Sequence, residues 1–258
     1  MRVVLFTSEE PLYLPRYLRP VLRSHAESIA AVVLAPPRQP RHEQVLNYLR
    51  TFGPGAFPRV GLRFARGKLL DTLSPALQRT ATGRYHGVAS LACDHGVPVR
   101  RAPDTADTAF LEWFREVDPD VALSVICGQR LPAAVLDVPD EAVNVHGSLL
   151  PKYRGRATAF WPLYYGDEES GVTAHLMTES FDAGPIVEQR PFPIEPDDSM
   201  HDLSLKIAAT GGPLAVALLD RYPKGFETRP NLTEPDDYHT LPTPPERREF
   251  RRRGNEFL

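Results

Sequence analysis

The sequence predicts an α/β protein of the Rossmann-like class, with a mostly parallel, twisted sheet and helices on both faces. Its opening is a strand–helix–strand unit, because Val3–Phe6 and Ile29–Leu34 are short, apolar and β-branched, and residues 14–22 between them are apolar at helical spacing. Two further apolar runs, Val121–Ile126 and residues 142–146, follow the same strand pattern. Strands joined through helices are typical of a parallel sheet.

The remaining elements follow from periodicity and from turn residues. We expect helices at Tyr85–His95, Thr108–Val117, Thr158–Tyr165 and 203–219, and strands at Val97–Val99, Val172–Met177 and Ile186–Ile194. Gly211-Gly212-Pro213 predicts a kink or break in the last helix. Residues 35–83 are rich in proline and arginine, with helical fragments expected at Glu43–Phe52 and Lys68–Leu77. We interpret them as a surface excursion, with an insertion covering the acceptor side as the alternative.

Composition restricts the class of protein. The 258 residues are long enough for one catalytic domain, assigned to 1–222, and a short C-terminal extension, 223–258. There is no run of 18 apolar residues and no pattern of a signal peptide, and Cys93 and Cys127 have neither metal-ligand spacing nor a disulfide framework. We therefore expect a cytoplasmic protein with no membrane partner.

Charge argues against a nucleic-acid partner. The net charge is −3, and the one strongly basic stretch is residues 246–253 at the C-terminal end. We interpret this stretch as a solvated terminal face, with a contact to a phosphate-bearing acceptor as the alternative.

The most informative stretch of the chain is the apolar strand at 142–146 and the loop after it. Asn144 and His146 are two positions apart, so both side chains point to the same face of the strand. A polar pair on an apolar strand is costly unless it is used or satisfied. With a later carboxylate, Asp182, these are the groups needed to stabilise an oxyanion and to move a proton.

Three linked motifs give the chain its resemblance to a known family. They are Asn144-x-His146-x-Ser-Leu-Leu-Pro-x-Tyr-Arg-Gly155, Gly171-Val-Thr-Ala-His175, and Asp182-Ala-Gly-Pro-Ile186. In order and spacing, this set resembles the folate-dependent formyltransferases. The resemblance covers the middle third of the chain and implies the formyltransferase fold.

The resemblance also implies a reaction. In it, a primary amine attacks the formyl carbon of the co-substrate 10-formyltetrahydrofolate, and Asn144, His146 and Asp182 are the catalytic residues. Asn144 donates to the oxyanion, His146 donates or accepts the proton, and Asp182 orients the imidazole; no metal is needed. Gly128, Gln129, Arg130 and Leu131 follow a buried strand and resemble the loop whose main chain binds the pterin ring.

Each of these residues also has a structural interpretation. Asn144 could close a turn, His146 could be a satisfied core histidine, and Asp182 could stabilise its own turn. His175 is interpreted as structural, Arg154 as ordering its loop, and Ser148 is rejected as a nucleophile because it lies in no Gly-x-Ser-x-Gly elbow. The shared motif favours catalysis for Asn144, His146 and Asp182.

The acceptor is expected to be the amine of a small molecule such as a nucleotide-linked amino sugar. Two features favour it: the loop Thr7–Pro11 contains no glycine to cradle a phosphate, and 36 residues after Tyr222 are too few for a closed barrel. The alternatives are a methionyl-tRNA formyltransferase lacking its C-terminal barrel, a formyltetrahydrofolate hydrolase, and a non-catalytic folate-binding protein.

Overall fold

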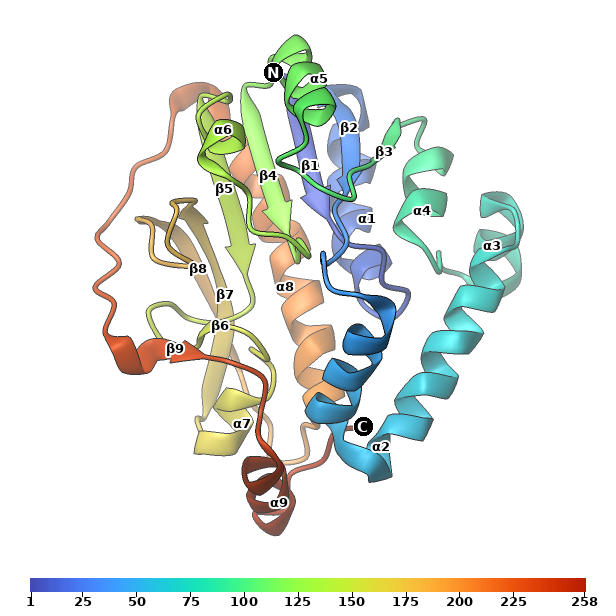
Figure 1. Cartoon of the computed structure of the whole chain (residues 1–258), viewed down its shortest axis with the longest axis vertical. Helices are drawn as coiled ribbons and strands as arrows, with labels where there is room; N and C mark the ends of the chain where they lie inside the picture. Colours follow the sequence, from blue (N-terminus) through green and yellow to red (C-terminus); the bar gives the residue numbers. More distant parts are fainter.

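The protein folds around one seven-stranded sheet, which confirms the predicted fold class (Figure 1). The structure is a computed structural model that describes residues 1–40, 42–222 and 224–258. The sheet strands are β1 (Val3–Thr7), β2 (Ile29–Leu34), β3 (Val99–Arg101), β4 (Val121–Val125), β5 (Glu141–His146), β7 (Glu169–Leu176) and β8 (Ile186–Pro193). The helices are α1 (Leu14–His25), α2 (Arg41–Asp71), α3 (Pro75–Thr82), α4 (Val88–Asp94), α5 (Thr108–Val117), α6 (Ala133–Leu136), α7 (Trp161–Tyr165), α8 (Met200–Arg221) and α9 (Pro244–Arg252).

The strand order is β3-β2-β1-β4-β5-β7-β8. The pairs from β3 to β5 are parallel, whereas β7 is antiparallel to both β5 and β8. The carboxyl ends of β1, β4 and β5 therefore meet at one edge of the sheet, where ligands bind in open α/β folds.

The two faces of the sheet bury different helices, as alternation along β1 requires. Val3 and Leu5 belong to the larger core, which also contains the buried faces of α1, α4 and α8. Val4 and Phe6 belong to the second core, where the Phe6 ring packs edge-on against Phe114 of α5 at a centroid distance of 5.5 Å. Both faces are thus covered, which is why β1, β2 and β4 are nearly all buried.

Residues 35–83 contain more helix than the sequence indicates. The predicted fragment Glu43–Phe52 is the first part of α2, which continues past a kink at Gly53, where φ is +67°. The predicted fragment Lys68–Leu77 is wrong, because α2 ends at Asp71 and α3 starts afresh. Ser74 caps α3 by accepting a hydrogen bond from the Leu77 amide, so the break has a local cause.

Helix α8 is continuous through Gly211-Gly212-Pro213, so the break predicted as one of two outcomes there is wrong. The glycines serve close packing instead: a Cβ on Gly211 would lie 2.0 Å from the Tyr17 hydroxyl oxygen of α1. Helix α8 is also the one helix in the described residues long and apolar enough to span a membrane. Half of that apolar window is buried, and its buried side chains belong to the larger core.

This packing predicts a large effect of Gly211→Ala. The added methyl group must displace the buried Tyr17, so we expect a loss of about 1–3 kcal/mol in the free energy of unfolding, as for overpacked cores. Urea denaturation followed by circular dichroism measures it. Gly61→Ala in α2 is the matched control, because nothing lies within 4 Å of its Cβ and alanine there should be neutral or stabilising. Equal stabilities of the two variants would contradict the packing argument.

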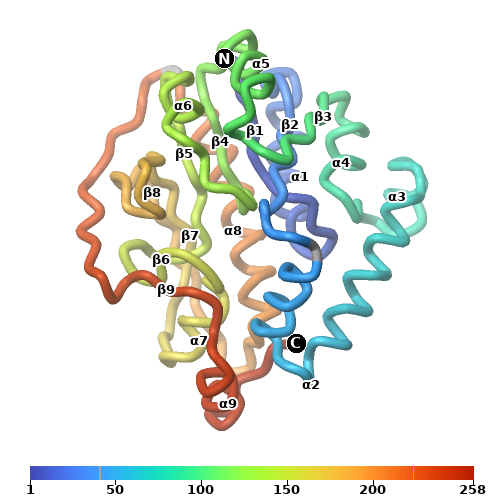
Figure 2. Tube along the Cα trace, in the orientation of Figure 1, coloured from blue at the N-terminus to red at the C-terminus, as the bar shows by residue number. Residues whose placement is uncertain are grey.

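The C-terminal extension runs down the side of the molecule beside β8 and then turns across to α9 at its lower end (Figures 1 and 2). It forms β9 (Tyr238–His239), which pairs with β6 (Arg154–Gly155), and ends in α9. The basic stretch 246–253 is therefore not simply a solvated face. Its Phe250 is fully buried and stacks on Phe160 at 4.6 Å, while Arg252 and Arg253 both pair with Glu249.

Candidate active site at the carboxyl end of β5

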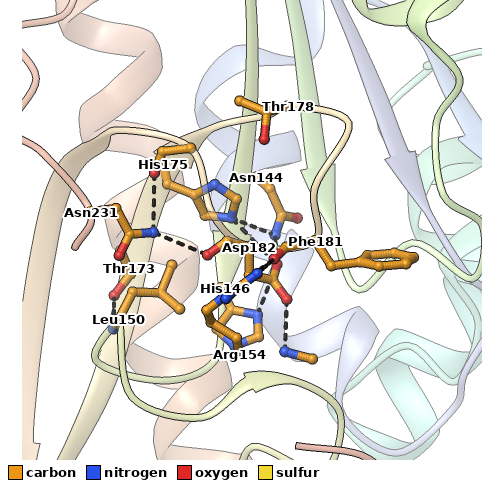
Figure 3. A network of polar contacts seen from close by, with 12 residues as sticks. Asn144, His146, Leu150, Arg154, Thr173, His175, Thr178, Phe181, Asp182 and Asn231 are labelled. Atoms are coloured by element: carbon orange, nitrogen blue, oxygen red, sulfur yellow. Dashed lines mark hydrogen bonds and ion pairs between the residues drawn. The ribbon is translucent and has the colours of Figure 1, made fainter. Parts of the chain in front are cut away.

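Asn144 and His146 lie on the same face of β5, as the strand pattern predicts (Figure 3). Their antiparallel partners on β7 are His175, opposite Asn144, and Thr173, opposite His146. The pairing places a second histidine directly beside the Asn144 side chain, and the Asn144 Nδ2 atom lies 3.1 Å from His175 Nε2. The strand pairing therefore assembles three polar side chains on one face.

Asp182 completes the cluster from the loop between β7 and β8 (Figure 3). Its Oδ1 atom lies 3.4 Å from His146 Nδ1, 3.4 Å from Asn144 Nδ2 and 3.5 Å from His175 Nε2. Its other oxygen accepts a hydrogen bond from the Gly155 amide at 2.9 Å. Asn144 and His146 thus both face one carboxylate oxygen of Asp182. The sequence singles out these three residues, although they are up to 38 positions apart.

The hydrogen-bond partners fix the protonation pattern of both histidines. The Nε2 atom of His146 lies 2.9 Å from the Tyr153 carbonyl, which can only accept, so Nε2 carries the hydrogen. In neutral His146 the lone pair is then on Nδ1 and faces Asp182. His175 donates from Nδ1 to the Leu176 carbonyl at 2.9 Å, so its Nε2 accepts from Asn144. His146 is therefore the member of the pair with a basic nitrogen free to take a proton.

Burial and charge act in opposite directions on the acid and the base. Burial lowers the pKa of His146 below its ordinary value, although Asp182 and the Tyr153 carbonyl raise it in part. Burial raises the pKa of Asp182, but His146, His175 and the Gly155 amide outweigh it and hold this pKa well below its usual range. At neutral pH the site therefore contains a neutral imidazole facing a carboxylate, which can accept a proton and stabilise the resulting cation.

The backbone around this cluster is strained. Residues other than glycine with positive φ are found at Ile126, Tyr153, Ala157 and Asp182, with values of +49°, +60°, +58° and +50°. These positions cost energy and persist where surrounding contacts hold them. They follow β4, lie in the loop after β5 and form the Asp182 turn, so the strain surrounds the polar cluster.

The predicted folate loop lies at the end of β4 and is held rigidly. A Cβ on Gly128 would lie 2.5 Å from the Pro37 ring, so only glycine fits against residues 35–37. The buried Gln129 side chain accepts from the Thr105 amide and donates to carbonyls of neighbouring loops at 2.9 Å. The Gln129 side chain therefore holds the loop in place, a role that the sequence does not indicate.

The rest of the folate loop has features suited to a ligand. Among the described residues, the main chain of Arg130 and Leu131 makes no hydrogen bond to other backbone groups. Leu131 is buried, while the Arg130 guanidinium lies over the Phe181 ring, 5.7 Å from its centroid. Phe181 directly precedes Asp182, so this loop reaches the polar cluster.

The loop after β1 is closed to anions by its own glutamates. The Glu10 carboxylate accepts hydrogen bonds from the amides of Leu12, Tyr13 and Leu14 at 2.6–3.2 Å, at the start of α1. Glu9 accepts from the Val88 amide at 2.7 Å, at the start of α4. A helix N-terminus attracts phosphate, but here internal carboxylates already occupy both.

Other motif residues serve the loops. The Ser148 hydroxyl donates to the Lys152 carbonyl at 2.8 Å, in agreement with its rejection as a nucleophile. Arg154 donates from Nη2 to the Phe181 carbonyl at 2.8 Å, the loop-ordering role expected for it. Sequence reasoning missed Asn231, whose side-chain amide contacts the Asp182 loop from the C-terminal extension. No local motif marks Asn231, because its partners are 47 and 49 residues away.

The site lies at the edge of the sheet where ligands are expected. Asp182 keeps 11% of its side-chain surface exposed and His146 keeps 7%. A hollow of about 440 Å³ lies at the opposite edge, lined by Met1, Arg2, Glu27, Ser28, Ala30 and Asp120, and contains none of these groups.

Comparison with known sequences decides the family. The profile of the formyl transferase family matches residues 75–219, more than half of the 258 residues. The chain belongs to the formyl transferase family. This match contains all the catalytic and folate-loop residues predicted from the sequence, and it ends before the C-terminal extension.

Among curated relatives, the methionyl-tRNA formyltransferase of Thermosynechococcus vestitus is 40% identical over 139 residues, which are 53% of this chain and 42% of the relative. That of Trichlorobacter lovleyi is 38% identical over 134 residues, or 52% and 42% of the two chains. The matched part thus spans less than half the length of these formyl transferase relatives.

Solved structures extend the likeness to nearly the whole fold. Glycinamide ribonucleotide transformylase 1 from Symbiobacterium toebii has a TM-score of 0.60 at 16% identity, over 89% of this chain and 93% of that one. The N-formyltransferase from Helicobacter canadensis, in complex with folinic acid and dTDP-3-aminofucose, has a TM-score of 0.60 at 17% identity, over 93% and 71%. At these identities the likeness concerns the formyl transferase fold.

Proposed function

We propose that the protein is an N-formyltransferase that moves the formyl group of 10-formyltetrahydrofolate to a primary amine. The observation that carries this proposal is that Asn144 Nδ2 and His146 Nδ1 each lie 3.4 Å from the same Asp182 oxygen, Oδ1, in a chain of this family. The curated formyltransferases at 40% and 38% identity support the same reaction class. The catalytic unit is residues 1–222, with 223–258 as an extension.

The chemistry follows from the hydrogen-bond pattern. Attack of the amine on the formyl carbon forms a C–N bond and moves the carbonyl electron pair onto oxygen. Asn144 donates to that oxygen with the Nδ2 hydrogen that now points at Asp182 across a long 3.4 Å contact. The free Nδ1 of His146 takes the proton released by the amine, and Asp182 stabilises the imidazolium. Collapse of the intermediate breaks the bond to folate N10, which leaves as tetrahydrofolate after gaining a proton.

The donor would lie along the loop after β4. Gly128 and Gln129 fix the path of that loop, and the main chain of Arg130 and Leu131 offers polar groups to the pterin ring. In this arrangement Gln129 supports the loop through its side chain.

The acceptor is proposed to be a small amine, that of a nucleotide-linked amino sugar. Glu9 and Glu10 fill both helix N-termini beside β1, so a terminal phosphate has no backbone site there. The complex of the Helicobacter canadensis N-formyltransferase with dTDP-3-aminofucose supports this class. The curated relatives favour a second candidate, the methionyl group of charged initiator transfer RNA.

One assay separates these candidates. The protein is incubated with 10-formyltetrahydrofolate and, in turn, with amino-sugar nucleotides, charged initiator transfer RNA, or no acceptor, and tetrahydrofolate release is followed. Release in step with formylation of an amino sugar is expected. Release only with transfer RNA would show that charged initiator transfer RNA, and not an amino sugar, is the acceptor. Equal release without any acceptor would indicate a hydrolase. No release with any acceptor would contradict the proposed activity.

A further inference from the structure

The C-terminal extension contacts two loops at the polar cluster, the one that carries Asp182 and the one that carries Gly155. Asn231 donates from its side-chain amide to the carbonyls of Asp182 and Gly184, at 3.0 and 3.1 Å (Figure 3). Beside it, Arg229 and Ile186 exchange backbone hydrogen bonds at 2.8 and 2.9 Å. Arg229 and Asn231 therefore bind the segment around the Asp182 turn through backbone and side-chain hydrogen bonds.

A few residues later the same extension contacts the other loop. Strand β9 pairs with β6, and the Arg156 amide donates to the His239 carbonyl at 2.9 Å. The fit is tight, because a Cβ on Gly155 would lie 2.4 Å from that same carbonyl oxygen. The His239 ring also packs against Trp161, with a centroid distance of 4.6 Å.

These two contacts hold the two partners of one hydrogen bond, that from the Gly155 amide to the Asp182 carboxylate. The Asp182 carboxylate is aimed at His146 while its other oxygen accepts from the Gly155 amide. The extension holds Asp182 on one side of this bond, through Asn231, and Gly155 on the other, through β9. The Asp182 backbone has φ of +50°, a conformation that needs such external support.

We propose that the C-terminal extension positions the catalytic carboxylate, and that Asn231 is its positioning residue. This inference rests on the proposed function in one respect, that Asp182 takes part in catalysis. The contacts between Asn231 and the Asp182 turn do not depend on that function. Asn231 touches no reacting group; it acts through the main chain of the Asp182 turn. The orientation of its carboxamide is fixed, because two carbonyl oxygens can only accept and must face the Nδ2 hydrogens.

The orientation makes Asn231→Asp a sharp test. This substitution keeps the size of the side chain but sets a carboxylate oxygen against two carbonyl oxygens, so the turn must move away. Asn255→Asp is the matched control, because Asn255 also lies in the extension and donates to a carbonyl, that of Leu163, at 3.0 Å. That contact lies on α7, away from Asp182.

The main readout is the pKa of His146, measured by NMR titration and assigned by comparison with His146→Gln. The charged or titratable groups that act on His146 are Asp182, which raises its pKa, and His175 and Arg154, which lower it. Displacing the Asp182 carboxylate should therefore lower the pKa of His146 in Asn231→Asp, but by less than in Asn231→Ala, because the new carboxylate adds a negative charge that raises this pKa in part. Asn255→Asp should leave it unchanged, whatever its effect on the melting temperature.

The second readout is turnover. We expect Asn231→Asp to lower kcat by about 10- to 100-fold, the range for a misplaced catalytic group, with an unchanged KM for the folate. The acid limb of its pH–kcat profile should move to lower pH, together with the pKa of His146. An unchanged His146 pKa in Asn231→Asp would overturn the inference, even if the variant is less stable.

The design keeps this inference separate from the proposed activity. If the wild-type protein formylates no amine but the His146 pKa still falls in Asn231→Asp, the proposed function fails and the positioning role stands. If Asn231→Asp does not fold, Asn231→Ala gives the same titration without a buried charge. An unshifted His146 pKa in that variant would equally overturn the positioning role.

Discussion

Replacing His146 with alanine is expected to lower kcat by about 10²- to 10⁴-fold, the contribution of a positioned general base. The reason is that His146 has the free basic nitrogen of the cluster, since Nε2 donates to the Tyr153 carbonyl and Nδ1 faces Asp182. The folate loop lies on a different strand end, so the affinity for folate should change little. Steady-state kinetics and fluorescence titration with tetrahydrofolate measure the two effects separately.

The direction of the His146 pKa shift determines how kcat should depend on pH. Because burial lowers the pKa of His146, the neutral base predominates above a pKa that lies below the ordinary value of about 6.5. In the wild type, kcat should be flat near neutrality and should fall as the pH drops through that pKa. His42→Ala, at an exposed position on α2, is the control and should retain full activity. The role of His146 would be refuted by a His146→Ala enzyme with wild-type kcat.

Local sequence predicted those parts of the fold whose contacts are local or periodic. Thr108–Val117 and Ile29–Leu34 were predicted with the observed bounds, because each has a clear apolar period and clear breakers. Lys68–Leu77 failed because the Ser74 cap and Pro75 start a new helix inside an apolar pattern. Gly211-Gly212-Pro213 looked like a break because the sequence does not reveal that Tyr17 packs against this helix.

The same distinction applies to the candidate site. Asn144 and His146 could be placed on one face because strand geometry alone fixes that relation. His175 was placed in a motif, but its contact with Asn144 depends on the antiparallel register of β5 and β7, which the chain does not state. Asn231 could not be found at all, because its partners lie far away in sequence. Long-range pairing, rather than composition, is what sequence reasoning lacks here.

The loop after β1 has contacts that the sequence does not indicate. Its lack of glycine predicted poor phosphate binding, whereas in the structure its two glutamates accept hydrogen bonds from the backbone amides at the starts of α1 and α4. The difference matters for design. Creating a phosphate site would require removal of Glu10, which would leave three backbone amides for the phosphate to accept from.

Asp182→Asn is expected to lower kcat by about 10²- to 10⁴-fold, as large an effect as loss of the base itself. The Gly155 amide requires an acceptor, so the carboxamide oxygen should take the place of Oδ2. The new NH₂ group then replaces Oδ1, 3.4 Å from His146 Nδ1, and donates to the lone pair that must accept the proton. A single-atom change thus both blocks the base and removes the charge that stabilises its cation.

The pH profile separates this mechanism from simple loss of structure. Asp182 raises the pKa of His146, so its removal should move the acid limb of kcat to lower pH while the plateau falls. Asp167→Asn is the matched control, because Asp167 supports the same loop by accepting from the Tyr153 hydroxyl at 2.8 Å but is not among the groups that face His146. It should lower stability without moving the limb. An unmoved acid limb in Asp182→Asn would mean that the charge of Asp182 does not stabilise the protonated His146 imidazole. The carboxylate would then act only on the fold.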